Sequence, residues 1–205
     1  MNQIHPTAII EKGAQLGKGN YIGPNCYIGN GVIIGDGNRF DGYCSIGTPP
    51  EHRDHWKGGK GVSIGNGCVI REFTTINSGC TRLTTIRDKV VMLRGSHVGH
   101  DGIIEAFANI SCNVLVGGYT IVMQGANLGL GSIVHQNHVV GPYAMLGMGC
   151  VVPKKIAIEP FNIYVGNPAK FLKTNKVGIE RAGLTLQDMD TLRKRYENLI
   201  SNADH

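Results

Sequence analysis

The chain has 205 residues, of which 41% are hydrophobic and 17% are charged, and its formal net charge is +5. This size suits one domain with a small appendage and a sizeable buried core. The modest charge gives no sign of nucleic-acid binding, no stretch is apolar enough for a membrane span, and the N-terminus lacks a signal-peptide pattern, so we expect a cytoplasmic protein.

From the N-terminus onwards an aliphatic residue recurs every six positions. The phase holds over residues 4–46, 64–76 and 86–152, with Phe40 as the one aromatic member. A small residue mostly stands two positions before each of them, and glycine often follows directly. This period fits neither a helix nor simple strand alternation. It indicates short strands separated by tight turns around a narrow core.

The cysteines fit the same repeat. Cys26, Cys44, Cys68 and Cys150 fall on the small position, which points inward in this scheme. None of the six cysteines stands in a CxxC pair. We therefore predict buried free thiols and no disulfide framework.

This pattern resembles the hexapeptide-repeat proteins, whose fold is a left-handed parallel β-helix with three repeats in each triangular coil. The resemblance implies an all-β fold of about seven to eight coils over residues 1–153. Two insertions interrupt the phase. The segment 47–61 contains Trp56 and a dense mix of charge and predicts an exposed loop, and the segment 77–83 predicts a smaller bulge at a corner.

The repeat ends after Val152, and residues 154–205 form a C-terminal extension. Its first part is irregular, and residues 154–181 carry an excess of Lys and Arg that could meet phosphates, meet an acidic partner or simply be solvated. From about residue 185 the pattern becomes helical, with Thr185 and Asp188 resembling a capping box. We expect this short α-helical segment to pack across the end of the β-helix or on a neighbouring subunit.

His100, Gly118 and Gln136 follow one another at intervals of three repeats. If three repeats make a coil, these residues form one vertical column at a corner, with His97 and His135 nearby. The column offers a base and donors for a developing oxyanion, which are the groups that acyl transfer needs. The alternative is that the histidines merely cap a corner.

A metal site is a further alternative, because trimeric β-helix carbonic anhydrases bind zinc through three histidines. The pairs His97/His100 and His135/His138 do not resemble that spacing, and His138 falls on the inward position. We therefore predict no metal ligands. The loop histidines His52 and His55 are predicted to be solvated.

Several short motifs are more specific than the repeat. They are "IHPTAII" at 4–10, "REFTTI" at 71–76, "SHVGHD" at 96–101, "VGG" at 116–118, "VHQ" at 134–136 and "NKVGIERAGL" at 175–184. Over nearly the whole chain they resemble the LpxA-like family, the acyl-carrier-protein-dependent UDP-N-acetylglucosamine O-acyltransferases of lipid A synthesis. The resemblance implies a homotrimer with the active site between subunits.

The resemblance also implies roles for individual residues. His100 is the expected general base, with Asp101 orienting it and the Gly118 N–H as oxyanion donor. Residues expected to bind the substrate are His97, Gln136, His135, Asn175, Arg181, Tyr119, His52 and Asp54. Tyr119 stands where the family has a histidine, and His52 and Asp54 lie in a loop that differs from the family's substrate loop.

The expected acyl donor is the thioester of acyl carrier protein or of coenzyme A, with no bound cofactor. Lys170 and Lys173, in the basic segment, are the expected donor-binding residues. The acceptor is a hydroxyl or amine of a UDP- or dTDP-linked sugar, for lipid A or another surface polysaccharide. A coenzyme A-dependent sugar acetyltransferase and a non-catalytic or metal-binding β-helix trimer remain the alternatives.

Overall fold

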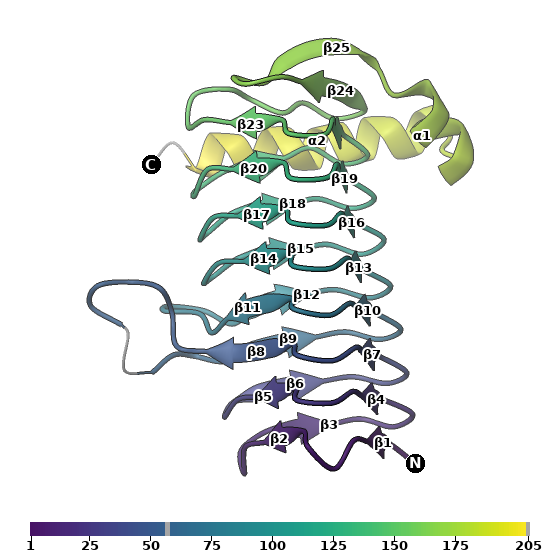
Figure 1. The fold of residues 1–205 in the computed structure, drawn as a ribbon. Helices are drawn as coiled ribbons and strands as arrows, with labels where there is room; N and C mark the ends of the chain where they lie inside the picture. The colour runs from purple at the N-terminus through teal and green to yellow at the C-terminus, as the bar shows by residue number, and fades with distance from the viewer. Residues whose placement is uncertain (56–57, 204–205) are drawn as a thin grey trace.

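The computed structural model describes residues 1–55 and 58–203. Its main body is a left-handed parallel β-helix of about nine turns that rises from the N-terminus to two short helices near the C-terminus (Figure 1). The predicted fold class is therefore confirmed. Trp56 and Lys57 of the predicted loop lie outside the described residues.

The strands form three sheets, one for each face of a triangular prism. Sheet A contains, in spatial order, β1 (Gln3–Ile4), β4 (Tyr21–Ile22), β7 (Arg39–Phe40), β10 (Val69–Ile70), β13 (Val91–Met92), β16 (Asn109–Ile110), β19 (Asn127–Leu128), β22 (Met145–Leu146), β24 (Asn162–Val165) and β25 (Lys170–Thr174). Sheet B contains β2 (Ile9–Ile10), β5 (Tyr27–Ile28), β8 (Ser45–Thr48), β11 (Thr75–Asn77), β14 (His97–Val98), β17 (Leu115–Val116), β20 (Ile133–Val134) and β23 (Val151–Val152). Sheet C contains β3 (Gln15–Leu16), β6 (Val32–Ile34), β9 (Val62–Ile64), β12 (Thr84–Ile86), β15 (Ile103–Ile104), β18 (Ile121–Val122) and β21 (Val139–Val140).

The six-residue phase explains the core. Each inward aliphatic residue pairs in register with its equivalent on the next coil, as Val98 does with Val116 and Val116 with Val134. These side chains are buried along the axis from Ile22 to Val152, and the four cysteines on the small position are buried with them. The inward assignment is thus confirmed, and all six cysteines are free thiols.

The coil count was predicted too low. The structure has about nine turns rather than seven to eight, because sheet A continues beyond the repeat. There β24 pairs in parallel with β22 and places Tyr164 beside Leu146. Ile158 and Tyr164 stand six and twelve residues after Val152 and keep the phase, but the irregular, proline-punctuated sequence around them hid this strand. The antiparallel strand β25 then ends the sheet.

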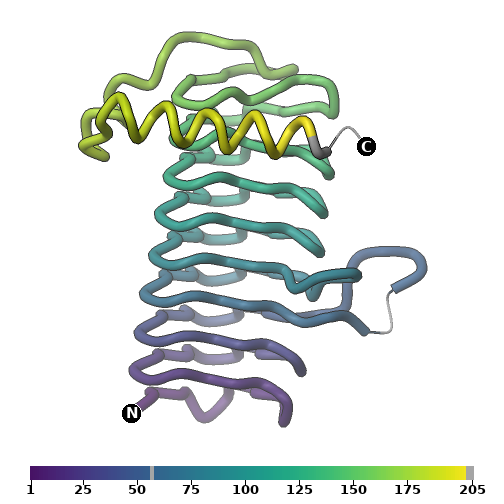
Figure 2. The backbone as a smooth tube through the Cα atoms, turned by 180° about the vertical axis from the view of Figure 1, so that it is seen from behind, coloured from purple at the N-terminus to yellow at the C-terminus, as the bar shows by residue number. Residues whose placement is uncertain are grey.

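The C-terminal extension covers two faces at one end of the prism. Helix α1 (Lys176–Ala182) follows β25 on the sheet A side, and α2 (Leu186–Ala203) crosses the last coils on the side that faces the viewer in Figure 2. Tyr196 of α2 is buried with Met123 and Val139 of the sheet C side. The helix therefore lies across a lateral face of its own chain, fixed also by an ion pair between Arg195 and Glu105.

The start of α2 has a simple local cause. The Asp188 carboxylate accepts hydrogen bonds from the Thr185 N–H (2.9 Å) and hydroxyl (2.6 Å), and the Thr185 hydroxyl accepts one from the Asp188 N–H (3.2 Å). These bonds satisfy backbone groups that a helix end leaves unpaired. No helix in the described ranges is long and apolar enough to cross a membrane.

The turns stack into three corners, which we name by the sheets that they join. In the B–C corner, between sheets B and C, the residues Asp101, Tyr119 and Asn137 of consecutive coils all have positive φ. The segments 47–61 and 77–83 also leave the coil at this corner, since they link β8 to β9 and β11 to β12. Both insertions into the repeat therefore lie at the B–C corner, together with the turns that carry Asp101, Tyr119 and Asn137.

Candidate active site

The residues of the predicted column lie on consecutive coils of the B–C corner. The Tyr119 N–H donates to the His100 carbonyl (2.9 Å), and the Asn137 N–H donates to the Gly118 carbonyl (2.8 Å). His100, Gly118 and Gln136, which precede the residues of positive φ, are therefore stacked one above another. The spacing of three repeats places the column as expected.

His100 and Asp101 form a buried pair in this corner. His100 is only 8% exposed and Asp101 is fully buried. The distance from His100 Nδ1 to Asp101 Oδ2 is 2.9 Å. A carboxylate can only accept a hydrogen bond, so Nδ1 carries the proton and Nε2 keeps its lone pair. His100 is thereby oriented as a base at Nε2.

The insertion at 77–83 holds Asp101 in its charged form. Burial alone raises the pKa of the Asp101 carboxyl, but hydrogen bonds outweigh it and hold the pKa well below its usual range. The donors are the backbone N–H groups of Cys80 (2.7 Å), Thr81 (2.8 Å) and Arg82 (2.9 Å), together with His100. Asp101 therefore stays ionised at any working pH, and the orientation of His100 is constant.

Gly118 lies against the free edge of the His100 imidazole. A Cβ placed on Gly118 would stand 2.8 Å from both His100 Nε2 and Cε1, so any side chain there would displace the ring. Within residues 1–55 and 58–203 the Gly118 N–H has no hydrogen-bond acceptor. A base and an unused donor thus lie side by side, which is the arrangement that acyl transfer requires.

Two aromatic rings enclose His100. The rings of His52 and Tyr119 both meet it edge to face, with centroids 5.5 Å and 5.2 Å away. Arg82 lies over the outer part of Tyr119, 5.9 Å from its centroid. His52 thus brings the 47–61 loop onto the site. Asp54 is exposed and donates its backbone N–H to His52 Nδ1 (3.2 Å), a hydrogen bond within the loop.

His97 faces outward from sheet B, next to the corner. Its Nδ1 lies 2.8 Å from the Thr75 hydroxyl, and burial lowers the pKa of the imidazole. It borders a groove of about 460 Å³ that also contacts Leu115 and Ile133. His97 is therefore a neutral polar group beside an apolar groove, whereas His135 and Gln136, one coil beyond Gly118, are exposed.

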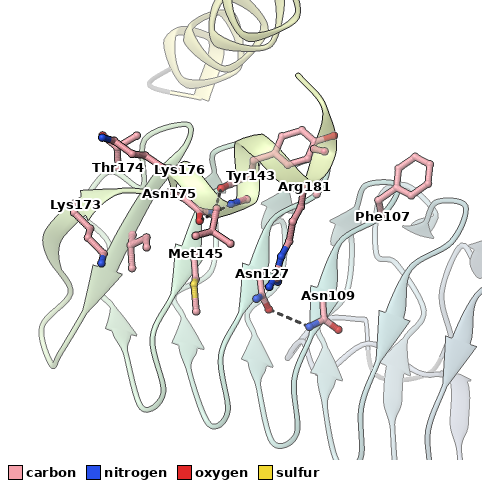
Figure 3. Close-up of a pocket in the computed structure, with 15 residues that line it drawn as sticks. Phe107, Asn109, Asn127, Tyr143, Met145, Lys173, Thr174, Asn175, Lys176 and Arg181 are labelled. Carbon is pink, nitrogen blue, oxygen red and sulfur yellow. Dashed lines mark hydrogen bonds between the residues drawn. The ribbon is translucent and has the colours of Figure 1, made fainter. Parts of the chain in front are cut away.

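A larger cavity lies on sheet A (Figure 3). It encloses about 1270 Å³ between the outer side chains of that sheet and the segment 173–182. Arg181 points into it toward Asn127, whose side chain accepts a hydrogen bond from Asn109 (3.0 Å). An arginine and amides in a deep cavity suit a nucleotide and its phosphates.

Asn175 was expected to bind the substrate, and in the structure its side chain makes hydrogen bonds within the chain. Its Nδ2 donates to the Tyr143 carbonyl (2.9 Å), and its Oδ1 accepts from the Gly178 N–H (3.1 Å) at the start of α1. The side chain thus fixes α1 over the cavity. Lys173 lines the same cavity, while Lys170 is exposed at the other end of β25. The two predicted donor-binding lysines therefore face different surroundings.

The cavity and the His100 column lie on opposite sides of the chain. The chain passes from sheet A to B to C in each coil, so the B–C corner is the edge of the prism opposite sheet A. Helix α2 further covers the sheet C face between them at these coils. A ligand in the sheet A cavity cannot contact His100 of the same chain.

Sequence reasoning missed the residues that clamp the site. Cys80 Sγ lies 3.4 Å from His100 Nδ1, and burial first, with Asp101 next, raises the pKa of this thiol to about 11. Arg82 donates two hydrogen bonds to the Asp101 carbonyl. An insertion has no period, so only its position at this corner could have drawn attention to it.

Comparisons with known proteins agree with these features. A family model described as bacterial transferase hexapeptide (six repeats) matches residues 13–48. An acyl-(acyl-carrier-protein)–UDP-N-acetylglucosamine O-acyltransferase from Paraburkholderia phymatum is 34% identical over 99% of this chain and 85% of that protein. Both the repeat and the extension beyond it are thus shared with that relative.

Solved structures give the same picture. A UDP-N-acetylglucosamine acyltransferase from Francisella novicida matches with a TM-score of 0.81 and 26% identity, over 95% of this chain and 79% of that one. LpxA from Acinetobacter baumannii matches with a TM-score of 0.80 over 98% and 89%, and at 24% identity this likeness concerns the fold alone.

Proposed function

Because the chain belongs to the family of acyl-(acyl-carrier-protein)–UDP-N-acetylglucosamine O-acyltransferases, we propose that it transfers an acyl group from acyl carrier protein to UDP-N-acetylglucosamine or a closely related UDP-sugar. The observation that carries this proposal is the packing of the His100 imidazole over Gly118, where a Cβ would stand 2.8 Å from Nε2, beside the buried Asp101. No observation favours coenzyme A or a non-catalytic role.

The reaction follows from this geometry. The sugar hydroxyl attacks the thioester carbonyl carbon while His100 Nε2 takes its proton, and the Gly118 N–H donates to the oxygen that becomes negative. The C–S bond then breaks. His100 returns the proton to the departing thiolate of the carrier protein. The thioester supplies the activated acyl group, so the step needs no bound cofactor.

The surroundings of the pair suit the two substrates. His97 and Gln136 would hold the sugar, and Leu115 and Ile133, which line the groove beside His97, would offer apolar surface to the acyl chain. Arg181 in the sheet A cavity would bind the diphosphate, because a guanidinium matches phosphate geometry. Lys170 would meet the acidic carrier protein. We propose a cytoplasmic location for the protein.

The opposite placement of the sheet A cavity and the B–C corner favours a site shared by two chains. Since the sheet A cavity and the B–C corner of one chain face away from each other, a nucleotide held by Arg181 can reach only the His100 of a neighbour. A ring of identical subunits supplies this arrangement at every interface. We propose a homotrimer. Light scattering that gives a stable monomer of about 22.0 kDa contradicts it.

The proposed function is tested with the purified protein, acyl carrier proteins loaded with acyl chains of different length, and UDP-N-acetylglucosamine. We expect an acylated UDP-sugar, detected by mass spectrometry, and we expect His100→Ala to abolish it. A UDP-sugar analogue with an amine at the accepting position tests O- against N-acylation. Transfer from acyl-coenzyme A but from no carrier protein contradicts the proposed donor.

A further inference from the structure

The 47–61 loop and the 77–83 insertion bring three metal-binding side chains together outside the proposed chemistry. One ligand atom each of His52, His55 and Cys80 lies within 4.8 Å of the other two. The His52 and His55 rings are 5.1 Å apart between centroids. Two imidazoles and a thiol are the ligand types that Zn²⁺ prefers.

We propose that His52, His55 and Cys80 form a Zn²⁺ site at the entrance to the His100 corner. Zn–N and Zn–S bonds of about 2.0 to 2.3 Å place neighbouring ligand atoms of a tetrahedral ion roughly 3.3 to 3.8 Å apart. The three side chains are thus within a small adjustment of that geometry. His55 is exposed and His52 partly exposed, so their rings can rotate to close it.

Cys80 is distinguished from the other buried thiols of the chain. Cys26, Cys44 and Cys68 lie inside the prism, where their thiols contact backbone carbonyls. The Cys80 N–H donates to Asp101, and the Cys80 sulfur contacts an imidazole, at His100 Nδ1, instead of a backbone carbonyl. The potential metal ligands that lie with this sulfur in clusters of three are His52, His55, His100 and Asp101.

Cys80, His100 and Asp101 also have ligand atoms within 4.8 Å of one another, but this second group is less suited to an ion. The Asp101 oxygens already accept bonds from the backbone of the insertion, and His100 Nδ1 uses its proton for Asp101. An ion therefore binds on the loop side of Cys80, with water as the fourth ligand.

The position of the ion implies that it inhibits acyl transfer. Cys80 Sγ lies 3.4 Å from His100 Nδ1, and the centroid of the His52 ring lies 5.5 Å from that of the His100 ring. An ion bound to Cys80 and His52 fixes the 47–61 loop over the corner and obstructs the approach of substrates to His100. This inference goes beyond the proposed function, since binding needs no substrate.

Binding is measured on the full chain without substrates, by titration with Co²⁺ as a spectroscopic probe and by competition for Zn²⁺ with a chromophoric chelator. We expect one ion per chain and a thiolate-to-cobalt absorption band. His55→Ala alters an exposed side chain, and we expect it to weaken binding by at least about tenfold. Cys80→Ser should remove the band.

Matched control variants distinguish this site from non-specific binding of the ion to any cysteine or histidine. Cys112→Ser removes another free cysteine, and His5→Ala removes an exposed histidine at the far end of the β-helix. Both should bind the ion like the original chain. Loss of the band in Cys112→Ser with retention in Cys80→Ser overturns the proposal, as does unchanged affinity in His55→Ala.

The inhibitory role has its own readout. Zn²⁺ should lower the acyl-transfer rate of the original chain and leave that of His55→Ala unaffected at the same free concentration. Equal inhibition of both proteins contradicts the role. Because the ion titration is independent of turnover, a chain that binds Zn²⁺ at these residues but shows no acyl transfer refutes the proposed function and leaves the metal site standing.

Discussion

The two halves of the proposed site are built in different ways. At the B–C corner, His100 and Asp101 are buried and held by short hydrogen bonds from an insertion, so each atom has a fixed direction. In the sheet A cavity, the exposed side chains are Arg181 of the short helix α1 and Lys173 of β25. A rigid corner suits proton transfer, and an open cavity suits binding of a long, charged ligand.

The largest effect is expected where the rigid half loses its base. His100→Ala should lower kcat by at least about 100-fold, because a positioned imidazole contributes roughly 10² to 10⁴. His97→Ala, on the same face but without contact to Gly118, should mainly raise KM for the sugar. Steady-state kinetics measure both effects, and an unchanged oligomeric mass shows that each variant is still folded and assembled. Full activity of His100→Ala would mean that the histidine only caps the corner.

A methyl group can test how rigid the corner has to be. In Gly118→Ala the new Cβ would stand 2.8 Å from His100 Nε2, so the imidazole must move. We expect kcat to fall by about 10- to 100-fold, with little change in sugar binding. Gly58→Ala, where a Cβ meets open space, is the control. Equal rates for the two variants would show that the ring position is unimportant.

A substitution in the sheet A cavity should change binding of the UDP-sugar rather than the turnover rate. Arg181→Gln removes a guanidinium from the diphosphate, and we expect KM for the UDP-sugar to rise by about tenfold, since hydrogen bonds to charged groups contribute roughly 1.5 to 3 kcal/mol. Arg94→Gln changes an exposed arginine elsewhere and should be neutral. A fall in kcat with constant KM would remove Arg181 from the nucleotide site.

The smallest expected effects are on KM, and they should differ between the two lysines of β25. Lys170→Glu should raise KM for acyl carrier protein a few-fold by repelling an acidic partner. Lys173→Glu should instead raise KM for the UDP-sugar, because this residue lines the cavity. The effect of Lys170→Glu should fade as salt is added. If neither KM responds, the basic segment is a solvated surface.

The same contrast explains what the sequence can predict. A six-residue period predicts which side chains point inward. With three repeats in each coil, which the family resemblance implies, the same spacing also predicts the β-helix and the column of His100, Gly118 and Gln136. The donors to Asp101 come from an insertion whose path has no period, and His55 meets Cys80 across a gap of chain that no spacing rule covers. Asn175 was predicted as a nucleotide ligand, but its amide is used by Tyr143 and the start of α1.

The central claim, that each site combines the corner of one chain with the cavity of another, is tested by mixing two defective proteins. His100→Ala lacks the base, and Arg181→Glu repels the diphosphate. If the variants are unfolded and reassembled together in equal amounts, about a quarter of the interfaces in a ring pair an intact corner with an intact cavity. We therefore expect kcat/KM to recover to about a quarter of the original value. Activity no higher than the average of the two separate variants would show that both halves must lie on one chain.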